Sequence, residues 1–205
     1  MSRPEYELLA RLRPALPPKP QTTIDLIEED EATGETAAAY QYFRDQTGRQ
    51  DVPGILKCFG INPAFVRQMV DISSSLLFND GYLERQQKEL IATYISHLNA
   101  CPYCVDSHGF FLTVHGATET MARNVAVGDL TELTEQQRQL LLYLGKVNDE
   151  SFRTSQLDVQ KLRDLGWQER QIAEAIHVAA MMGFCNRVAN AFGLQSQDLL
   201  SLKRD

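Results

Sequence analysis

Long hydrophobic runs are absent from this sequence. No part of its 205 residues approaches the roughly 18 uninterrupted apolar residues that a membrane-spanning helix needs. The first six residues (MSRPEY) also lack the basic start and the continuous apolar segment of a signal peptide. We therefore expect a cytoplasmic location and no membrane partner.

An excess of positive charge is also missing. The 20 lysines and arginines face 27 aspartates and glutamates, which gives a formal net charge of -7. An acidic chain without a large basic cluster lacks the electrostatic footprint of DNA- and RNA-binding proteins. We therefore expect no nucleic-acid partner, and a small molecule or another protein instead.

Cysteine is scarce. Of the four cysteines, Cys101 and Cys104 form a close pair, whereas Cys58 and Cys185 are isolated in the sequence. Cytoplasmic thiols stay reduced unless they are catalytic or bind metal. Structural zinc commonly takes two cysteine-rich pairs, and a c-type haem needs histidine where Val105 stands. We expect no metal and no cofactor, although a metal site and an inert buried pair remain alternatives to a redox dithiol. The isolated cysteines are interpreted as small buried apolar residues.

Convincing strand-like alternation is missing too, so the sequence predicts an all-α protein. Capping signals at Asn62-Pro63 and Thr134-Glu135-Gln136-Gln137 precede apolar residues at helical spacing. We predict helices over about 62–78, 83–99, 102–115, 134–147, 155–165, 168–183 and 186–192. The helix pairs 83–99 with 102–115 and 168–183 with 186–192 suggest a weak internal duplication, with halves at about 35–130 and 131–205.

Proline is concentrated at the beginning of the chain. Five of the eight prolines lie in residues 1–21, which we interpret as an extended arm on a neighbouring subunit or as a partly ordered tail. Residues 22–205 are then one all-helical domain.

The dithiol lies at the start of a predicted helix. Cys101 and Cys104 are three residues apart, and His108 follows Cys104 by one turn, so all three project from one face. Unpaired N–H groups in the first turn favour a thiolate. A thiolate that attacks a peroxide becomes a sulfenic acid, which a second thiol converts to a disulfide.

Side chains on two neighbouring predicted helices can transfer the protons that this chemistry requires. His108 titrates near neutral pH and can take up or return a proton. Glu89, on the preceding helix, is the candidate to orient the histidine, and Ser96 lies on the same helix face. The constellation predicts peroxide reduction through a dithiol and disulfide cycle.

The spacing of these residues resembles a family signature. The matching positions are Glu89, Ala92, Ser96, Asn99, Cys101, Tyr103, Cys104 and His108. They are similar to the signature of the alkylhydroperoxidase D-like family, part of the carboxymuconolactone decarboxylase superfamily. The helices over 62–78 and 134–192, with the segment Asn186-Arg187-Val188-Ala189, resemble the longer peroxidase-related branch.

The resemblance implies a helical bundle with a helical-hairpin active site that assembles as a trimer or hexamer. It implies that Cys104 is the peroxidatic thiolate, and that Cys101 resolves it and exchanges with an external dithiol or protein reductant. Glu89 and His108 would form the proton relay. Helix-terminus arguments alone favour Cys101 as the nucleophile, whereas the one-turn offset from Cys104 to His108 supports the assignment by family.

One position departs from the family pattern, and two other functions stay open. Tyr103 stands where members often have a histidine, and tyrosine is a poor proton carrier at neutral pH. Either Ser96 or a bound water fills the gap, or the peroxidase activity is weak. The alternatives are a carboxymuconolactone decarboxylase-type lactone enzyme, and a thiol-disulfide exchange or redox-sensing protein without turnover.

Overall fold

The computed structural model describes residues 3–13 and 21–202. Within these ranges the chain forms ten α-helices and two short 3₁₀ helices and contains no strand. The prediction of an all-α fold is therefore confirmed. None of the described helices is both long enough and apolar enough to cross a membrane.

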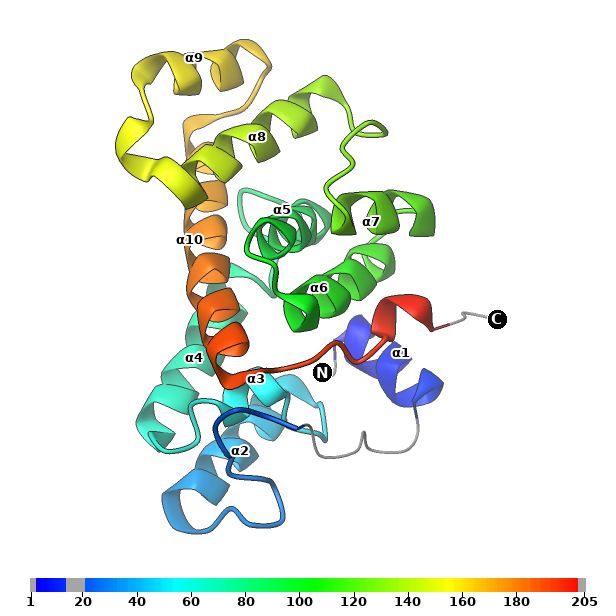
Figure 1. The fold of residues 1–205 in the computed structure, drawn as a ribbon, viewed down its shortest axis with the longest axis vertical. Coiled ribbons are helices and arrows are strands. Elements are labelled where there is room, and N and C mark those ends of the chain that lie inside the picture. Colours follow the sequence, from blue (N-terminus) through cyan, green and yellow to red (C-terminus); the bar gives the residue numbers. More distant parts are fainter. Residues whose placement is uncertain (1–2, 14–20, 203–205) are drawn as a thin grey trace.

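The helices follow one another in the order of Figure 1, and their bounds are as follows. They are α1 Pro4–Leu12, α2 Gly34–Thr47, α3 Gly54–Lys57, α4 Pro63–Leu76, α5 Arg85–Leu98, α6 Pro102–Val114, α7 Glu119–Ala126, α8 Glu135–Glu150, α9 Gln156–Asp164 and α10 Glu169–Phe192, with 3₁₀ helices at Ser151–Arg153 and Leu199–Ser201.

Helix α5 is the centre of the fold. Ten of its 14 residues are buried, because α6, α7, α8 and α10 pack around it (Figure 1). A tight connection joins α5 to α6, with Ala100 in a left-handed conformation at φ 48°. The backbone N–H of Cys101 donates to the carbonyl of Ser96 at 2.9 Å, which closes the hairpin. The predicted helical hairpin is therefore present.

Capping residues set the starts of several helices as the sequence predicted. The Asn62 side chain accepts a hydrogen bond from the N–H of Phe65, and Pro63 occupies the first turn of α4. Thr134 and Gln137 form a capping box at the start of α8. These local signals depend on neighbours in the sequence, so they can be read without the tertiary structure.

The predicted extended arm was wrong for residues 4–12, which form helix α1. Pro4 lies in the first helical turn, where a missing N–H costs nothing. Tyr6 and Leu9 pack on Phe110 and Phe111 of α6, so this segment lies on its own chain (Figure 1). The prolines at 14, 17, 18 and 20 lie outside the described residues.

The predicted break near residues 184–185 was also wrong, because α10 is one continuous helix of 24 residues. Gly183, Cys185 and Asn186 are buried there, so tertiary packing holds the helix together. A side chain at Gly183 would meet the Asn148 amide oxygen at 3.3 Å, so glycine permits α8 to approach. The second hairpin, on which the suggested duplication was based, is absent from this helix.

Candidate active site

The helical hairpin brings the four predicted catalytic residues together inside the protein. Cys101 is the N-cap of α6, Cys104 lies in its first turn, and His108 follows one turn later. Glu89 faces them from α5. The exposed fractions are 0% for Cys101, 3% for Cys104, 0% for Glu89 and 8% for His108, so their electrostatic interactions are poorly screened by water.

A short hydrogen bond links the two members of the predicted relay. Nδ1 of His108 donates to Oε2 of Glu89 at 2.7 Å. A carboxylate oxygen can only accept a hydrogen bond, so Nδ1 carries a hydrogen, and Nε2 is the ring nitrogen available for a reacting group. The other oxygen of Glu89 accepts from Nη2 of Arg85 at 2.6 Å. Glu89 is therefore fixed from both sides.

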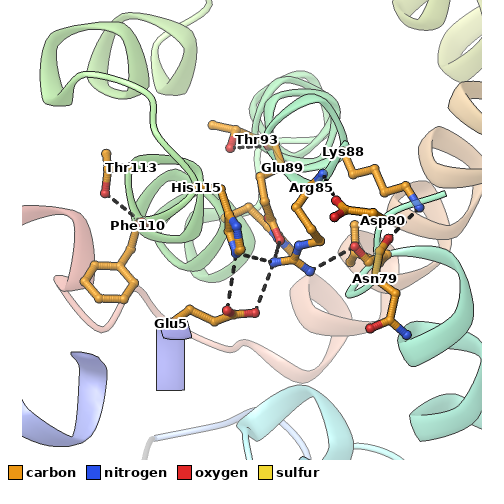
Figure 2. Close-up of polar contacts among 12 residues, drawn as sticks. Glu5, Asn79, Asp80, Arg85, Lys88, Glu89, Thr93, Phe110, Thr113 and His115 are labelled. Carbon is orange, nitrogen blue, oxygen red and sulfur yellow. Dashed lines mark hydrogen bonds and ion pairs between the residues drawn. The ribbon is translucent and has the colours of Figure 1, made fainter. Parts of the chain in front are cut away.

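The charge network continues behind Glu89 to the N-terminal helix (Figure 2). Arg85 also donates to Oε1 of Glu5 at 3.0 Å, and His115 lies 3.3 Å from Oε2 of Glu5. Burial raises the pKa of Glu5, but its hydrogen bond with His115 and the Arg85 charge outweigh burial, so this pKa is lowered. Glu5 is ionised at neutral pH and, with Glu89, encloses Arg85 between two carboxylates.

The two thiols behave as one titrating pair. The Cys104 thiol donates to the Cys101 sulfur and lowers the pKa of Cys101; the amides of Tyr103, Cys104 and Asn186 lower it further and outweigh burial. The same interaction, together with burial, raises the pKa of Cys104. The reduced pair therefore carries its first negative charge on Cys101 and keeps a proton on Cys104.

An amide network supports the sulfurs from α10. Nδ2 of Asn186 donates to Oγ of Ser96 at 3.0 Å, and Oδ1 of Asn186 accepts from Asn99 at 3.0 Å. The Asn99 side chain is in turn hydrogen-bonded to the side chain of Asn148 of α8. The predicted supporting residue Ser96 is thus hydrogen-bonded to Asn186, which the sequence analysis named only as part of a segment that resembles the family.

A cavity of about 100 Å³ opens onto the hairpin and is lined by residues of α1, α2, α3, α4, α6 and α10. Cys104 and His108 line it, whereas Cys101 and Glu89 are not among the described lining residues. The walls are mostly apolar and include Phe59, Phe78, Phe111, Met69 and Met182. The cavity therefore offers a reacting molecule the Cys104 sulfur and the histidine, with the other two residues behind them.

Tyr103, which stands between the cysteines, also lines this cavity. Burial raises the pKa of its phenol well above the ordinary value. The tyrosine therefore stays neutral at physiological pH and supplies a wall of the cavity rather than a proton carrier. This agrees with the departure noted in the sequence.

The remaining histidines and cysteines play different parts. His97 contacts the carbonyl of Ala126 at 3.1 Å. Burial raises the pKa of Cys58 and Cys185 to about 12, so both thiols stay protonated, as expected for apolar residues. Cys185 nevertheless lines the cavity, which its isolated position in the sequence did not indicate. Among the described residues, no three His, Cys, Asp or Glu side chains cluster so as to hold a metal ion.

Comparison with known proteins shows which families and structures this chain resembles. The model of the carboxymuconolactone decarboxylase family matches residues 63–144. An uncharacterized peroxidase-related protein with an alkylhydroperoxidase AhpD core, from Ralstonia eutropha JMP134, is 25% identical with a TM-score of 0.77, over 89% of this chain and 96% of that one. The chain is thus similar to the carboxymuconolactone decarboxylase family over residues 63–144, and its fold is similar to that of the alkylhydroperoxidase AhpD core over most of its length.

Two further solved structures share the fold. A peroxidase-related protein from Silicibacter sp. TM1040 is 25% identical with a TM-score of 0.73, over 85% of this chain and 91% of that one. The debrominase Bmp8 shares the fold at 16% identity and a TM-score of 0.68, over 88% and 95% of the two chains. The same fold is therefore also found in a debrominase.

A curated relative adds a shorter match. "Uncharacterized protein 4 in cox locus" of Paracoccus denitrificans is 38% identical over 45 residues. That match covers 22% of this chain and 40% of the relative, so the chain spans less than half of the length of that protein.

Sequence reasoning missed the outer part of this candidate site. Glu5 lay in the presumed arm, and its contact with Arg85 joins residues 80 positions apart. Arg85 itself carried a readable signal, because it precedes Glu89 by four residues on one helix. His115 was treated as an ordinary helix residue, and the structure places it against Glu5.

Proposed function

We propose that this protein is a thiol peroxidase that reduces organic hydroperoxides through a Cys101–Cys104 disulfide. The observation that carries the proposal is the arrangement around the cavity. Cys104 and His108 line it, while the hydrogen-bonded Cys101 and Glu89 stand directly behind them. A nucleophile, an acid, a resolving thiol and an orienting carboxylate thus meet at one apolar cavity.

In the first step, the sulfur that faces the cavity becomes the nucleophile. Transfer of the Cys104 proton to the hydrogen-bonded Cys101 sulfur moves the negative charge to Cys104 without changing the charge of the pair. The Cys104 thiolate attacks the terminal peroxide oxygen, so an S–O bond forms and the O–O bond breaks. Sulfur is oxidised to the sulfenic acid. His108 enters this step as the imidazolium, with its Nδ1 proton donated in the hydrogen bond to Glu89, and it gives its Nε2 proton to the leaving alkoxide, so that the alcohol and a neutral imidazole result.

In the second step, the resolving thiol completes the cycle. Cys101 attacks the Cys104 sulfur, the S–S bond forms, and the S–O bond breaks. The leaving hydroxide takes the Cys101 proton and departs as water. An external dithiol then reduces the disulfide and restores two protons to the site.

The surroundings of the dithiol bear on the identity of both co-substrates. The mostly apolar walls of the cavity favour an organic hydroperoxide over hydrogen peroxide. Cys101 has no exposed surface, so a reductant that enters through the cavity meets Cys104 first. A small dithiol fits this approach better than a folded protein does. Assembly into a trimer or hexamer stays a prediction.

The test is consumption of an organic hydroperoxide with excess dithiol, compared between wild type and Cys104→Ser. We expect turnover by the wild type and none by the variant. Cys58→Ala is the matched control, because Cys58 is a buried thiol outside the described cavity lining. Equal rates for wild type and Cys104→Ser would contradict the proposal.

A further inference from the structure

The cavity contains a cation whose hydrogen bonds are incomplete. Arg3, directly before α1, lines the cavity, and its guanidinium carbon lies 4.6 Å from the ring centroid of Phe78. Its Nη2 donates to Oγ of Ser74 at 2.9 Å. Its Nη1 is buried and has no hydrogen-bond partner among the described residues. A charged N–H group that is buried without an acceptor is energetically unfavourable, so this atom favours the binding of an anion.

The other charges around the cavity do not supply that partner. The described lining residues include no aspartate or glutamate. Arg49 also lines the cavity, but its Nε and Nη2 both donate to the carboxylate of Asp51. Among the described lining residues, Arg3 is thus the arginine with a buried donor that lacks a partner, and the cavity as a whole favours an anion.

We propose that Arg3 binds a carboxylate of the substrate, so that the protein acts on hydroperoxides of carboxylic acids. This inference rests on the proposed peroxidase function for its reaction, but the anion site itself does not depend on it. Nη1 of Arg3 would donate to one carboxylate oxygen, with the hydroxyls of Ser73 and Ser74 beside it in the lining. The apolar chain of the acid would lie along Phe78 and the neighbouring aromatic walls.

A carboxylate fits this site better than a phosphate does. The site offers one open guanidinium nitrogen and neighbouring hydroxyls in a cavity of about 100 Å³. A phosphate dianion has more acceptor oxygens and a larger charge, which commonly require several cationic donors. The mostly apolar remainder of the cavity matches an aliphatic acid with one charged end.

Helix α1 fixes the position of this arginine. Glu5, two residues further on, is held by Arg85, and Tyr6 packs against Phe111 while also lining the cavity. The N-terminal segment therefore contributes Arg3, at the N-cap of α1, to the cavity and Glu5, within α1, to the charge network behind the catalytic pair. A substrate carboxylate would thus bind to an element that is already anchored.

The experiment compares one hydroperoxide in two charge states. A linear aliphatic hydroperoxy acid and its methyl ester are turned over by wild type, Arg3→Gln and Arg3→Lys. We expect Arg3→Gln to raise KM for the acid by about tenfold or more, with KM for the ester unchanged. Arg3→Lys keeps the charge and should recover part of the loss. Ester turnover in the same sample shows that the variant is folded.

The control variant is Arg11→Gln, which removes an exposed arginine from the same helix. It should leave KM for the acid unchanged. Equal KM changes for the acid and the ester in Arg3→Gln, or no change for either, would overturn the proposal.

A binding measurement separates this proposal from the peroxidase function. The corresponding hydroxy acid, which cannot react, is titrated calorimetrically into wild type and Arg3→Gln. Tighter binding by the wild type supports the anion site even if neither hydroperoxide is turned over, in which case only the peroxidase proposal fails. Equal binding by both proteins refutes the role of Arg3 whatever the turnover.

Discussion

Nδ1 of His108 and Oε2 of Glu89 are 2.7 Å apart and buried between α5 and α6. The bond joins two helices at a distance of 19 residues in the chain. It fixes the imidazole ring so that Nε2 is the nitrogen left for the cavity. The proton steps proposed above depend on this one orientation.

The first prediction concerns Glu89→Gln. The amide keeps the shape of the side chain but removes the charge that orients His108 and balances Arg85. We expect the rate of hydroperoxide reduction to fall by on the order of a hundredfold. Steady-state kinetics over a range of pH measures the loss, and a changed pH profile distinguishes a role in proton transfer from simple destabilisation.

Glu132→Gln is the control for that substitution, since it makes the same chemical change at an exposed loop position. It should leave both rate and pH profile as in the wild type. A Glu89→Gln protein with the wild-type profile would remove Glu89 from the relay.

The second prediction concerns titration of the dithiol. Because the pKa of Cys101 is lowered from its ordinary 9.0 and that of Cys104 is raised, a single thiolate should form below pH 9. Cys58 and Cys185 do not interfere, since their pKa values are about 12. The ultraviolet absorbance of the thiolate measures this step.

Two substitutions at Cys104 test whether the hydrogen bond between the thiols causes the lowered pKa of Cys101. Cys104→Ser keeps a hydroxyl that can donate to the Cys101 sulfur, whereas Cys104→Ala removes the donor. We expect the pKa of Cys101 to stay low in the serine variant and to rise toward its ordinary value in the alanine variant. If both variants titrate alike, the hydrogen bond between the thiols is not the main cause.

The inner part of the site could be predicted from the sequence because its information is local. Glu89, Cys101, Cys104 and His108 fall within 20 residues, and capping and proline signals set the ends of the two helices that hold them. Helical periodicity then determines which side chains share a face. The structure confirms the hairpin and brings these residues together.

The outer part could not be predicted, because it depends on contacts between distant segments. Asn186 reaches Ser96 across 90 residues, and Glu5 reaches Arg85 across 80. Nothing in the pattern around Glu5 indicates burial, since it stands in a charged segment close to several prolines. The continuity of α10 likewise comes from packing against the rest of the fold.

The third prediction concerns Glu5→Gln. The substitution removes a buried charge that pairs with Arg85 and His115, so we expect a loss of about 1–3 kcal/mol in the free energy of unfolding near neutral pH. Chemical denaturation measures it. Glu7→Gln, at an exposed position of the same helix, should change stability little.

The pH dependence of that loss has a definite sign. The pKa of Glu5 is lowered in the folded state, below its ordinary 4.5. The ionised carboxylate therefore stabilises the fold at pH values above about 4.5, and this contribution disappears as the pH falls through the lowered pKa. The difference between wild type and Glu5→Gln should shrink in acid. A difference that stays constant down to the lowest pH would mean that the charge is not its source.

The last prediction identifies the sulfur that meets the peroxide. The two criteria disagree, because the lowered pKa favours Cys101 whereas Cys104 is the sulfur that lines the cavity. We give precedence to access, since a proton can move between two hydrogen-bonded thiols, whereas a substrate cannot reach a sulfur with no exposed surface. Cys101→Ser should therefore accumulate a sulfenic acid at Cys104 after one equivalent of hydroperoxide, detected by mass spectrometry after trapping with dimedone. Cys104→Ser should give no adduct at Cys101, and an adduct there would reverse the two roles.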